Sequence, residues 1–316
     1  MQIETSLNSF FNPKSVAIIG ASSKPGKLGS YVVRNIVSQG FKGKIYPINP
    51  DVNEVFGLKC YPSLAELPEV PDLSVILIPA SQVVPSLKDH QKKGVNHVIV
   101  MSAGFKEIGE QGKVLEDEIK NLINSNGIRL VGPNCLGIFD NISRVDSFFL
   151  PRDLIQRPNT GVVSLASQSG SFVAHIMDLA SFEHLGISRV LAYGNKADVN
   201  EVDALEYFAD DPHTKVVGLY LEDVVDGREF VRAAQYCSAK KPVIVLKTGK
   251  FDSLKHALTS HTGAIAGSYN SYVSAFRRSS LIEVHSEIEF IDACKAVALL
   301  PKARGNRVLI LGPLQL

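Results

Sequence analysis

The sequence predicts an α/β protein with two domains, a Rossmann-like one followed by a flavodoxin-like one. Short, wholly apolar runs recur along the chain, and such runs are typical of strands that are buried on both faces of a parallel sheet. Stretches of helical length separate these runs, and this alternation favours right-handed β-α-β crossovers. The pattern pauses once near the middle of the 316 residues and then restarts, and each half is long enough to bury a core of its own.

The composition is that of an ordinary soluble globular protein, with 45% hydrophobic residues, 21% charged residues and a net charge of +1. There is no long run of lysine or arginine, so nucleic acid is not an expected partner. The four cysteines are scattered without a C-x-x-C pair, which favours free thiols in a reducing compartment over a disulfide framework or a zinc site. The N-terminus lacks the features of a signal peptide, and no apolar run approaches the ~20 residues that span a bilayer. We therefore expect a cytoplasmic protein with no membrane partner and no metal site on this chain.

The first domain, expected over residues 1–143, opens with the apolar strand Ser15–Gly20. A loop that contains glycine follows, and Tyr31–Gln39 then has the pattern of a helix that ends at Gly40. Strand, glycine loop and helix in this order are the opening of a dinucleotide-type β-α-β unit. Further strands are expected at 44–49, 73–78, 96–101 and 128–132, with helices at 82–93 and 107–125.

Ligands of such sheets bind at the carboxyl ends of the strands, and here these ends are small, polar or turn-forming. The glycine loop is not a clean G-x-G-x-x-G motif, so alone it is weak evidence. An NAD site has an acid after the second strand for the ribose hydroxyls, whereas this chain has Asn49-Pro50, with Asp51 only beyond the proline. A phosphorylated nucleotide other than NAD is therefore favoured, and Lys24 and Lys27 either meet its phosphate charge or are solvated loop lysines.

A polar stretch at 144–160, interrupted by Pro151 and Pro158, is expected to link the two domains. The alternation then restarts and predicts a second domain over 161–302, which is flavodoxin-like by its pattern. Residues 303–316 contain what looks like the first strand of a third α/β domain, without a helix to cover it, so they are expected to be the start of a truncated domain. The strands of the second domain are expected at 161–166, 187–193, 215–221, 242–247 and 281–284, and its helices at 172–183, 201–209, 227–238, 270–278 and 286–299.

His261 lies in a loop of small residues, Ser260–Gly267, after the fourth strand of the second domain. Small neighbours leave its imidazole uncovered, so His261 is a candidate metal ligand, general base or nucleophile. The alternative is a loop histidine that only forms hydrogen bonds. Glu222 ends the third strand and is expected to face the same crevice, where a carboxylate on one ring nitrogen leaves the other nitrogen nucleophilic. Glu222 alone could equally be a solvated acid at the end of a strand.

A polar turn, Ser167-Gln168-Ser169-Gly170-Ser171, opens the first helix of the second domain. The free N–H groups and the positive dipole end of a helix make this position an anion site, although Ser169 alone would more often be a plain N-cap. A carboxylate, an exposed histidine and a helix N-terminus together favour a phosphoryl-transfer site over a hydrolase triad. The helix end would stabilise the negative charge of a phosphohistidine.

Four motifs occur in one order along the chain: Gly132–Gly137, Ser167–Gly170, Tyr193–Lys196 and Ser260–Ala264. Together they resemble the alpha subunit, or alpha-like part, of the nucleoside-diphosphate-forming acyl-CoA synthetases. The ADP-forming acetyl-CoA synthetases are the nearest members, and the succinyl-CoA synthetase alpha subunit is a more distant relative. The resemblance covers about residues 8–300 and implies a CoA-binding Rossmann-like domain followed by a succinyl-CoA-ligase-like domain.

The resemblance also implies roles for individual residues. His261 falls on the phosphorylated histidine of the family, Glu222 on the acid that orients it, and Ser167–Ser171 on the helix N-terminus that holds the phosphate. Cys135 would lie near the thioester without acting as a nucleophile. The residues implied around CoA are Gly20, Ala21, Ser22, Ser23, Lys27, Gly29, Asn49, Pro50, Pro79, Ala80, Ser81, Asn134 and Cys135.

The implied reaction converts acyl-CoA, ADP and phosphate reversibly into the acid, ATP and CoA, with the phosphoryl group carried on His261. In this family an ATP-grasp beta subunit or domain binds ADP or ATP and Mg²⁺, and this chain contains neither a Walker A loop nor an ATP-grasp pattern. The resemblance therefore implies part of an ADP-forming acid–CoA ligase, with acetate as the first expected acid, that joins such a partner in an oligomer.

Two other functions compete with this one. A non-catalytic CoA-binding regulatory module of a fused protein acyltransferase would need neither His261 nor Glu222, so the presence of both disfavours it. A nicotinamide-dependent oxidoreductase is disfavoured by Asn49-Pro50 at the end of the second strand.

Overall fold

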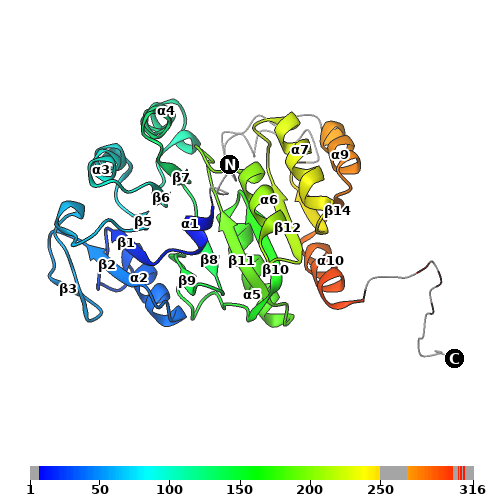
Figure 1. The fold of residues 1–316 in the computed structure, drawn as a ribbon, viewed down its shortest axis with the longest axis horizontal. Helices are drawn as coiled ribbons and strands as arrows, with labels where there is room; N and C mark the ends of the chain where they lie inside the picture. Colours follow the sequence, from blue (N-terminus) through cyan, green and yellow to red (C-terminus); the bar gives the residue numbers. More distant parts are fainter. Residues whose placement is uncertain (1–6, 250–268, 302–304, 306, 308, 310–316) are drawn as a thin grey trace.

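Two sheets with helices on both faces form the body of the molecule (Figure 1). The structure is a computed structural model, and it describes residues 7–249 and 269–301 together with residues 305, 307 and 309. The predicted α/β class, with a Rossmann-like domain before a flavodoxin-like one, is confirmed. The predicted start of a third domain falls mostly on residues outside the described part of the chain.

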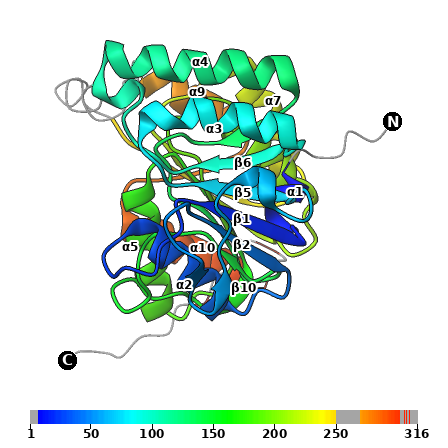
Figure 2. The ribbon, with the colours of Figure 1, turned by 90° about the vertical axis from the view of Figure 1, so that its left-hand side faces the viewer.

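The first sheet has five parallel strands in the order β2-β1-β5-β6-β7. Figure 2 shows α3 and α4 on one side of these strands and α2 on the other. The helix α2 ends where expected, because Gly40 takes a left-handed conformation with φ of 84° and caps it. The strands are β1 (Ser15–Ile19), β2 (Lys44–Ile48), β5 (Leu73–Ile76), β6 (His97–Val100) and β7 (Arg129–Val131), and the short pair β3 (Glu54–Val55) and β4 (Leu58–Lys59) forms a separate hairpin. The helices are α1 (Asn8–Phe11), α2 (Leu28–Gln39), η1 (Leu64–Glu66), α3 (Ala80–Lys93), η2 (Lys106–Ile108) and α4 (Glu110–Asn126).

The second sheet has seven strands in the order β14-β13-β12-β10-β11-β8-β9. The first five in this order are parallel, and β8 and β9 extend the sheet antiparallel beyond β11. The strands are β8 (Gly137–Asp140), β9 (Val145–Asp146), β10 (Thr160–Ser167), β11 (Ile187–Ala192), β12 (Val216–Leu221), β13 (Val243–Lys247) and β14 (Ile282–Val284). The helices are α5 (Gly170–Phe182), α6 (Glu201–Asp210), α7 (Gly227–Ser238), α9 (Tyr269–Arg278) and α10 (Glu287–Leu299).

The chain passes from the first sheet to the second between β7 and β8, which is earlier than the expected domain boundary at residue 143. The predicted linker, 144–160, likewise begins with β9. The strand β8 owes its place to pairing with the distant strand β11, and β9 pairs with β8 as its neighbour along the chain. The strands themselves were not predicted, because they are too short to show a periodic pattern in the sequence.

Buried contacts hold the two domains against each other. Asn35 of α2 is 1% exposed, and its Nδ2 donates hydrogen bonds to the carbonyl oxygens of Phe148 (2.7 Å) and Leu150 (2.9 Å). The ring of Phe11 stacks on that of Tyr207 with 5.1 Å between ring centroids. The segment between β9 and β10 is therefore fixed by the first domain as well as by the second.

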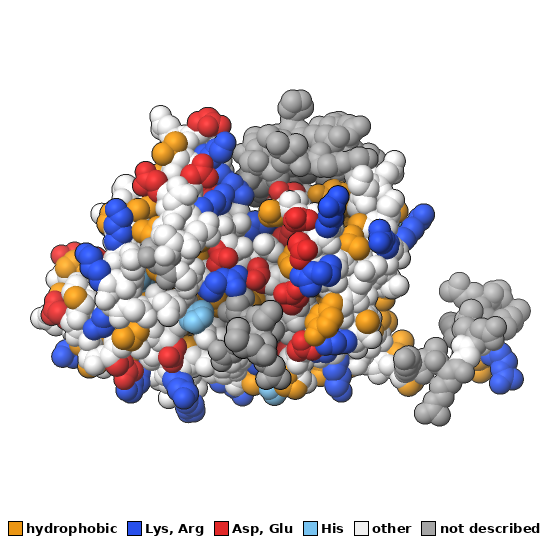
Figure 3. Space-filling model, turned by 45° about the horizontal axis from the view of Figure 1, so that its top comes forward, with side chains coloured by type: hydrophobic (Ala, Val, Ile, Leu, Met, Phe, Trp, Pro, Cys, Tyr) orange, Lys and Arg blue, Asp and Glu red, His pale blue; other side chains and the backbone are white. Residues whose placement is uncertain are grey.

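Acidic and basic side chains are interspersed over the face shown in Figure 3, as the near-zero net charge suggests. Within the described part of the chain, none of the helices is both long and apolar enough to cross a membrane.

Candidate active site

In each sheet the strand order reverses at one strand, so that the next strands along the chain lie on both sides of it. Open α/β sheets form their ligand crevices at the carboxyl end of that strand. In the first sheet this strand is β1, which lies between β2 and β5. In the second sheet it is β10, which lies between β11 and β12. The loops that leave β1 and β10 are both among the binding segments predicted from the sequence.

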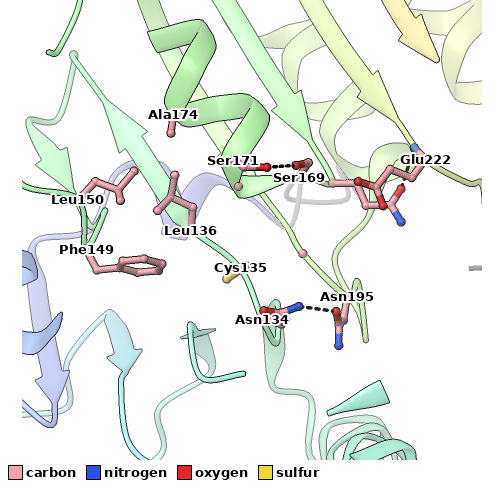
Figure 4. Close-up of a pocket in the computed structure, with 13 residues that line it drawn as sticks. Asn134, Cys135, Leu136, Phe149, Leu150, Ser169, Ser171, Ala174, Asn195 and Glu222 are labelled. Atoms are coloured by element: carbon pink, nitrogen blue, oxygen red, sulfur yellow. Dashed lines mark hydrogen bonds between the residues drawn. The ribbon is translucent and has the colours of Figure 1, made fainter. Parts of the chain in front are cut away.

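The turns after β7, β10, β11 and β12 meet at one cavity of about 470 Å³ (Figure 4). The cavity thus brings together the predicted turn at Ser167–Ser171, the predicted acid Glu222 and the turn that follows the last strand of the first sheet. Its described lining consists of Asn134, Cys135, Leu136, Phe149, Leu150, Gln168, Ser169, Gly170, Ser171, Ala174, Gly194, Asn195 and Glu222.

The N-terminus of α5 opens into this cavity. The hydroxyl of Ser167 accepts a hydrogen bond from the backbone N–H of Ser169 (3.1 Å), and the hydroxyl of Ser169 caps the helix by accepting one from the N–H of Phe172 (3.3 Å). A Cβ on Gly170 would lie 3.3 Å from Cβ of Leu136, so a larger residue would crowd the turn after β7. The first turn of α5 is thus held with its dipole end toward the cavity, an arrangement that attracts anions.

The side chain of Gln168 ties this turn to the end of β12. Its Oε1 accepts hydrogen bonds from the backbone N–H groups of Glu222 and Asp223, both at 3.2 Å. Its Nε2 donates to Oδ1 of Asp223 at 2.5 Å. Gln168 was predicted to bind phosphate, but in the structure its amide group is used to join two strand ends.

Glu222 is 4% exposed and follows directly after β12, on the wall of the cavity opposite the apolar residues (Figure 4). The ammonium of Lys247, at the end of β13, donates a 2.8 Å hydrogen bond to the carbonyl oxygen of Glu222. Burial lowers the pKa of Lys247 to about 8, although the negative charges of Asp223 and Glu222 oppose that shift. Glu222 lines the cavity, and the prediction that it shares a crevice with His261 and orients its imidazole stays a prediction.

Lys196 was missed as a site residue, although the motif that contains it was noticed. Its ammonium lies 2.7 Å from Oδ1 of Asp223 and 3.2 Å from Oε2 of Glu201, and its side chain is 2% exposed. Burial raises the pKa of Asp223, but the Lys196 charge and the hydrogen bonds from Lys196 and Gln168 outweigh it, so the pKa lies below its usual value. The backbone of Lys196 has φ of 49°, a left-handed conformation that costs energy in a non-glycine residue and often marks a functional turn.

Asn195, beside Lys196, faces the first domain and was also missed. Its Nδ2 donates to Oε2 of Glu107 (2.6 Å) and to Oε2 of Glu116 (2.9 Å), both from the first domain. Its Oδ1 accepts from Nδ2 of Asn134 at 3.2 Å (Figure 4). One turn therefore connects the polar side of the cavity to both domains.

Cys135 lines the cavity as a buried thiol. Its Sγ donates to the carbonyl oxygen of Val100 at 3.3 Å, and burial raises the pKa of the thiol far above its ordinary value. The group stays protonated at neutral pH, which agrees with the expectation that Cys135 is not a nucleophile.

The remaining residues predicted around CoA lie along the carboxyl edge of the first sheet, away from the described lining of the cavity. Nδ2 of Asn49 donates to the carbonyl oxygen of Ala21 at 2.7 Å, which joins the ends of β1 and β2. A Cβ on Gly29 would lie 2.0 Å from the carbonyl oxygen of Gly20, so α2 approaches β1 as closely as a glycine permits. This close approach fits a backbone cradle for phosphate groups at the start of α2. The other members of this set are Ser22, Ser23, Lys27, Pro50, Pro79, Ala80 and Ser81, each at least partly exposed.

His261 lies outside the described residues, so its predicted role stays a prediction. Within residues 7–249 and 269–301, no three His, Cys, Asp or Glu side chains cluster in a way that could hold a metal ion.

One end of the cavity is apolar. Leu136, Phe149, Leu150 and Ala174 form it, and the ring of Phe149 points toward Cys135 (Figure 4). Phe149 and Leu150 lie in the range that the sequence assigned to a domain boundary and a polar linker, so nothing in the local pattern marked them as a binding surface.

The fold and the site define a protein class in which a CoA-binding domain precedes a ligase-type flavodoxin domain. Residues 14–140 match the family model described as a CoA binding domain, and residues 160–297 match the succinyl-CoA ligase like flavodoxin domain. The chain belongs to the family formed by the alpha subunits and alpha-like parts of the ADP-forming acyl-CoA synthetases.

Individual relatives support this assignment. The alpha subunit of acetate–CoA ligase (ADP-forming) I from Pyrococcus furiosus is 39% identical over 310 residues, which cover 97% of this chain and 66% of that protein. The 4-hydroxybutyrate–CoA ligase (ADP-forming) from Nitrosopumilus maritimus is 38% identical over 304 residues, covering 95% of this chain and 43% of that protein. A solved structure, the dinucleotide-forming acetyl-coenzyme A synthetase 1 from Ca. Korarchaeum cryptofilum in complex with phosphate and ADP, superposes with a TM-score of 0.90 at 40% identity. The match covers 95% of this chain and 64% of that structure. This chain therefore spans about two thirds or less of each of these three relatives.

Proposed function

We propose that this chain is the CoA-binding and phosphoryl-carrying part of an ADP-forming acyl-CoA synthetase. The observation that carries the proposal is the meeting of the α5 N-terminus and Glu222 in one cavity, next to a domain of the CoA-binding family. A helix N-terminus supplies a place for phosphate, and a buried carboxylate supplies a partner for an imidazole. Both are needed if a histidine is to accept and hold a phosphoryl group.

The proposed chemistry has two steps on this chain. A phosphate oxygen attacks the thioester carbonyl carbon of acyl-CoA, the new C–O bond forms, the C–S bond breaks, and the CoA thiolate leaves and takes up a proton. A ring nitrogen of His261 then attacks the phosphorus of the acyl phosphate, the P–N bond forms, and the carboxylate of the free acid leaves. Covalent catalysis of this kind divides one transfer into two easier ones.

Each predicted residue has a part in this proposal. Glu222 would orient the imidazole of His261, and the first turn of α5, Ser167–Ser171, would hold the phosphate and later the phosphoryl group. The loop from Gly20 to Gly29 and the strand ends at Asn49-Pro50, Pro79–Ser81 and Asn134-Cys135 would hold CoA. Gln168, Asp223 and Lys196 would keep the α5 turn and Glu222 in register.

The nucleotide half of the reaction would come from a partner. A relative of known structure is described in complex with phosphate and ADP, and this chain covers 64% of it. We propose that an ATP-grasp subunit or domain binds ADP or ATP with Mg²⁺ and exchanges the phosphoryl group with His261 in an oligomeric assembly. A reducing, cytoplasmic setting fits the four free, buried cysteines.

Acetate is the first acid to test. It is named for several relatives, whereas 4-hydroxybutyrate is named for another.

Reconstitution tests the proposal. We expect CoA to bind the chain alone in calorimetry, and we expect ATP to form from acetyl-CoA, ADP and phosphate only when an ATP-grasp subunit of a related synthetase is added. ATP formation that needs the chain and is lost in His261→Ala supports the proposal. CoA binding without ATP formation, with any acyl-CoA and with the partner present, would instead favour the regulatory module.

A further inference from the structure

We propose that the apolar end of the cavity is the acyl chamber and that it selects an uncharged, apolar acyl group. The described walls of this chamber are Leu136, Phe149, Leu150 and Ala174. The inference rests on the proposed function, because it places the acyl group of the thioester beside the phosphate turn of α5. It adds the chemical class of the acid and the residues that select it.

One wall of the chamber, Ala174, belongs to the same helix as the phosphate turn. Gly170 and Ser171 line the polar part of the cavity, and Ala174 lies one turn further along α5 on the same side (Figure 4). An acyl phosphate with its phosphoryl group at the helix N-terminus therefore has its acyl carbons next to Ala174. The small side chain of Ala174 leaves that space open.

The wall formed by Phe149 and Leu150 is anchored by hydrogen bonds to its backbone. The carbonyl oxygen of Leu150 accepts hydrogen bonds from Nδ2 of Asn35 and from Nη2 of Arg157, both at 2.9 Å. The guanidinium of Arg157 is itself held by Asp146, since its Nε lies 2.9 Å from Oδ2 of that residue. The backbone at Leu150 is thus held from both domains, which sets the position of this wall.

The charges of the cavity lining favour some acyl groups over others. Among the described lining residues, Glu222 is the only one with a charged side chain, and it lies at the polar end. A second carboxylate on the acyl group would enter the apolar end without a positive partner. Burial of such a group is costly, so the chamber disfavours dicarboxylic acids such as succinate.

The cavity has room for the acyl group beside the reacting groups. Its volume of about 470 Å³ has to admit the phosphate, the thioester end of CoA and, in the proposed function, the imidazole of His261. Acyl carbons that enter the apolar end would contact Phe149, Leu150 and Ala174.

Titration calorimetry with S-alkyl-CoA thioethers tests the chamber without any turnover. We expect each added methylene to tighten binding about fourfold relative to CoA, which corresponds to about 0.8 kcal/mol per buried methylene. A thioether that ends in a carboxylate should bind no more tightly than CoA itself. Ala174→Phe should abolish the gain with chain length and leave the affinity for CoA unchanged, and Ala174→Leu should reduce that gain.

His175→Phe is the matched control, because it adds the same ring at the next residue of α5, where the side chain is 57% exposed and faces Glu287. It should leave the series of affinities unchanged. Equal binding of all thioethers would overturn the chamber, as would an Ala174→Phe variant that loses affinity for CoA and for every thioether by the same factor. Failure of CoA itself to bind the native chain would overturn the proposed function instead, so the two failures can be told apart.

Discussion

The amide of Gln168 donates a 2.5 Å hydrogen bond to the carboxylate of Asp223 and so fastens the start of α5 to the end of β12. The same side chain accepts the backbone N–H groups of Asp223 and of its neighbour Glu222. The proposed anion-binding turn and the proposed orienting carboxylate are therefore joined by one side chain. Lys196 completes the arrangement, because its ammonium lies 2.7 Å from Oδ1 of Asp223, the same oxygen that accepts the hydrogen bond from Gln168.

Replacing Lys196 by methionine should destabilise the second domain strongly. The change leaves Glu201, which is fully buried, and Asp223, whose side chain is 20% exposed, without their shared cation. Removal of one partner from a buried ion pair typically costs about 3–5 kcal/mol in the free energy of unfolding. Denaturant unfolding measures this loss, and adding Asp223→Asn to the variant should recover part of it.

Arg232→Met is the surface comparison for this experiment. Arg232 contacts Glu206 and Glu229, but its side chain is 54% exposed, so its loss should cost no more than about 1 kcal/mol. If the two variants lost the same stability, Lys196 would not be the buried hub that its contacts indicate.

Glu222→Gln should slow phosphoryl transfer to the chain while leaving the affinity for CoA unchanged. Glutamine keeps the size of the side chain but cannot offer a charged acceptor to an imidazole, and loss of such a group typically costs roughly 100- to 10,000-fold in rate. Rapid-quench measurement of phosphoenzyme formation gives the rate, and calorimetry gives the affinity. An unchanged rate would remove Glu222 from the proposed mechanism.

Gly29→Ala should weaken both folding and CoA binding. The added Cβ would lie 2.0 Å from the carbonyl oxygen of Gly20, so α2 must move away from β1, where the CoA cradle is proposed. Overpacking of this kind typically costs about 1–3 kcal/mol, which outweighs the higher helix propensity of alanine. Thermal unfolding and CoA titration measure the two effects.

Gly227→Ala is the control at the first turn of another helix. A Cβ there meets no atom within 4 Å, so we expect unchanged or slightly higher stability and unchanged CoA affinity. Equal behaviour of the two alanine variants would contradict the close approach of α2 to β1 as a requirement of the fold.

Lys247 should make stability depend on pH in the alkaline range. Its pKa is lowered from 10.5 to about 8 by burial, so between these values the unfolded chain binds a proton that the folded chain has released. The free energy of unfolding therefore rises with pH in this window, by at most about 1.4 kcal/mol per pH unit. Below pH 8 both states hold the proton and the contribution is constant.

Lys247→Met isolates this contribution from that of other lysines. The free energy of unfolding of the native chain minus that of the variant should increase as the pH is raised from 8 toward 10. A constant offset across that range would mean that the Lys247 ammonium is not destabilised by its surroundings.

The class of fold could be predicted because most strands of the two sheets are recognisable from their own sequence. Runs such as Ser15–Ile19 and Val216–Leu221 are almost entirely apolar and are buried almost throughout. By contrast, β8 and β9 have no local signature, since they exist through antiparallel pairing at the edge of the second sheet. Short strands of this kind depend on tertiary contacts and escape pattern reading.

The residues of the site likewise fall into those that could be predicted from the sequence and those that could not. The polar turn at Ser167–Ser171 and Glu222 could be predicted because each follows directly after a recognisable strand. Asn195 and Lys196 could not be assigned, because their partners Glu107 and Asp223 lie far away in the sequence and only the fold brings them together. The apolar wall at Phe149-Leu150 was hidden for a similar reason, as its position is set by Asn35 of the other domain.

The measurement that tests the central claim most directly is the intact mass of the chain after incubation with an acyl-CoA and phosphate, beside His261→Asn. We predict a gain by the mass of one phosphoryl group, labile to acid, in the native chain and none in the variant. A gain that persists in His261→Asn would contradict the phosphohistidine. The absence of any gain in the native chain, both alone and with an ATP-grasp partner, would contradict the proposed function as a whole.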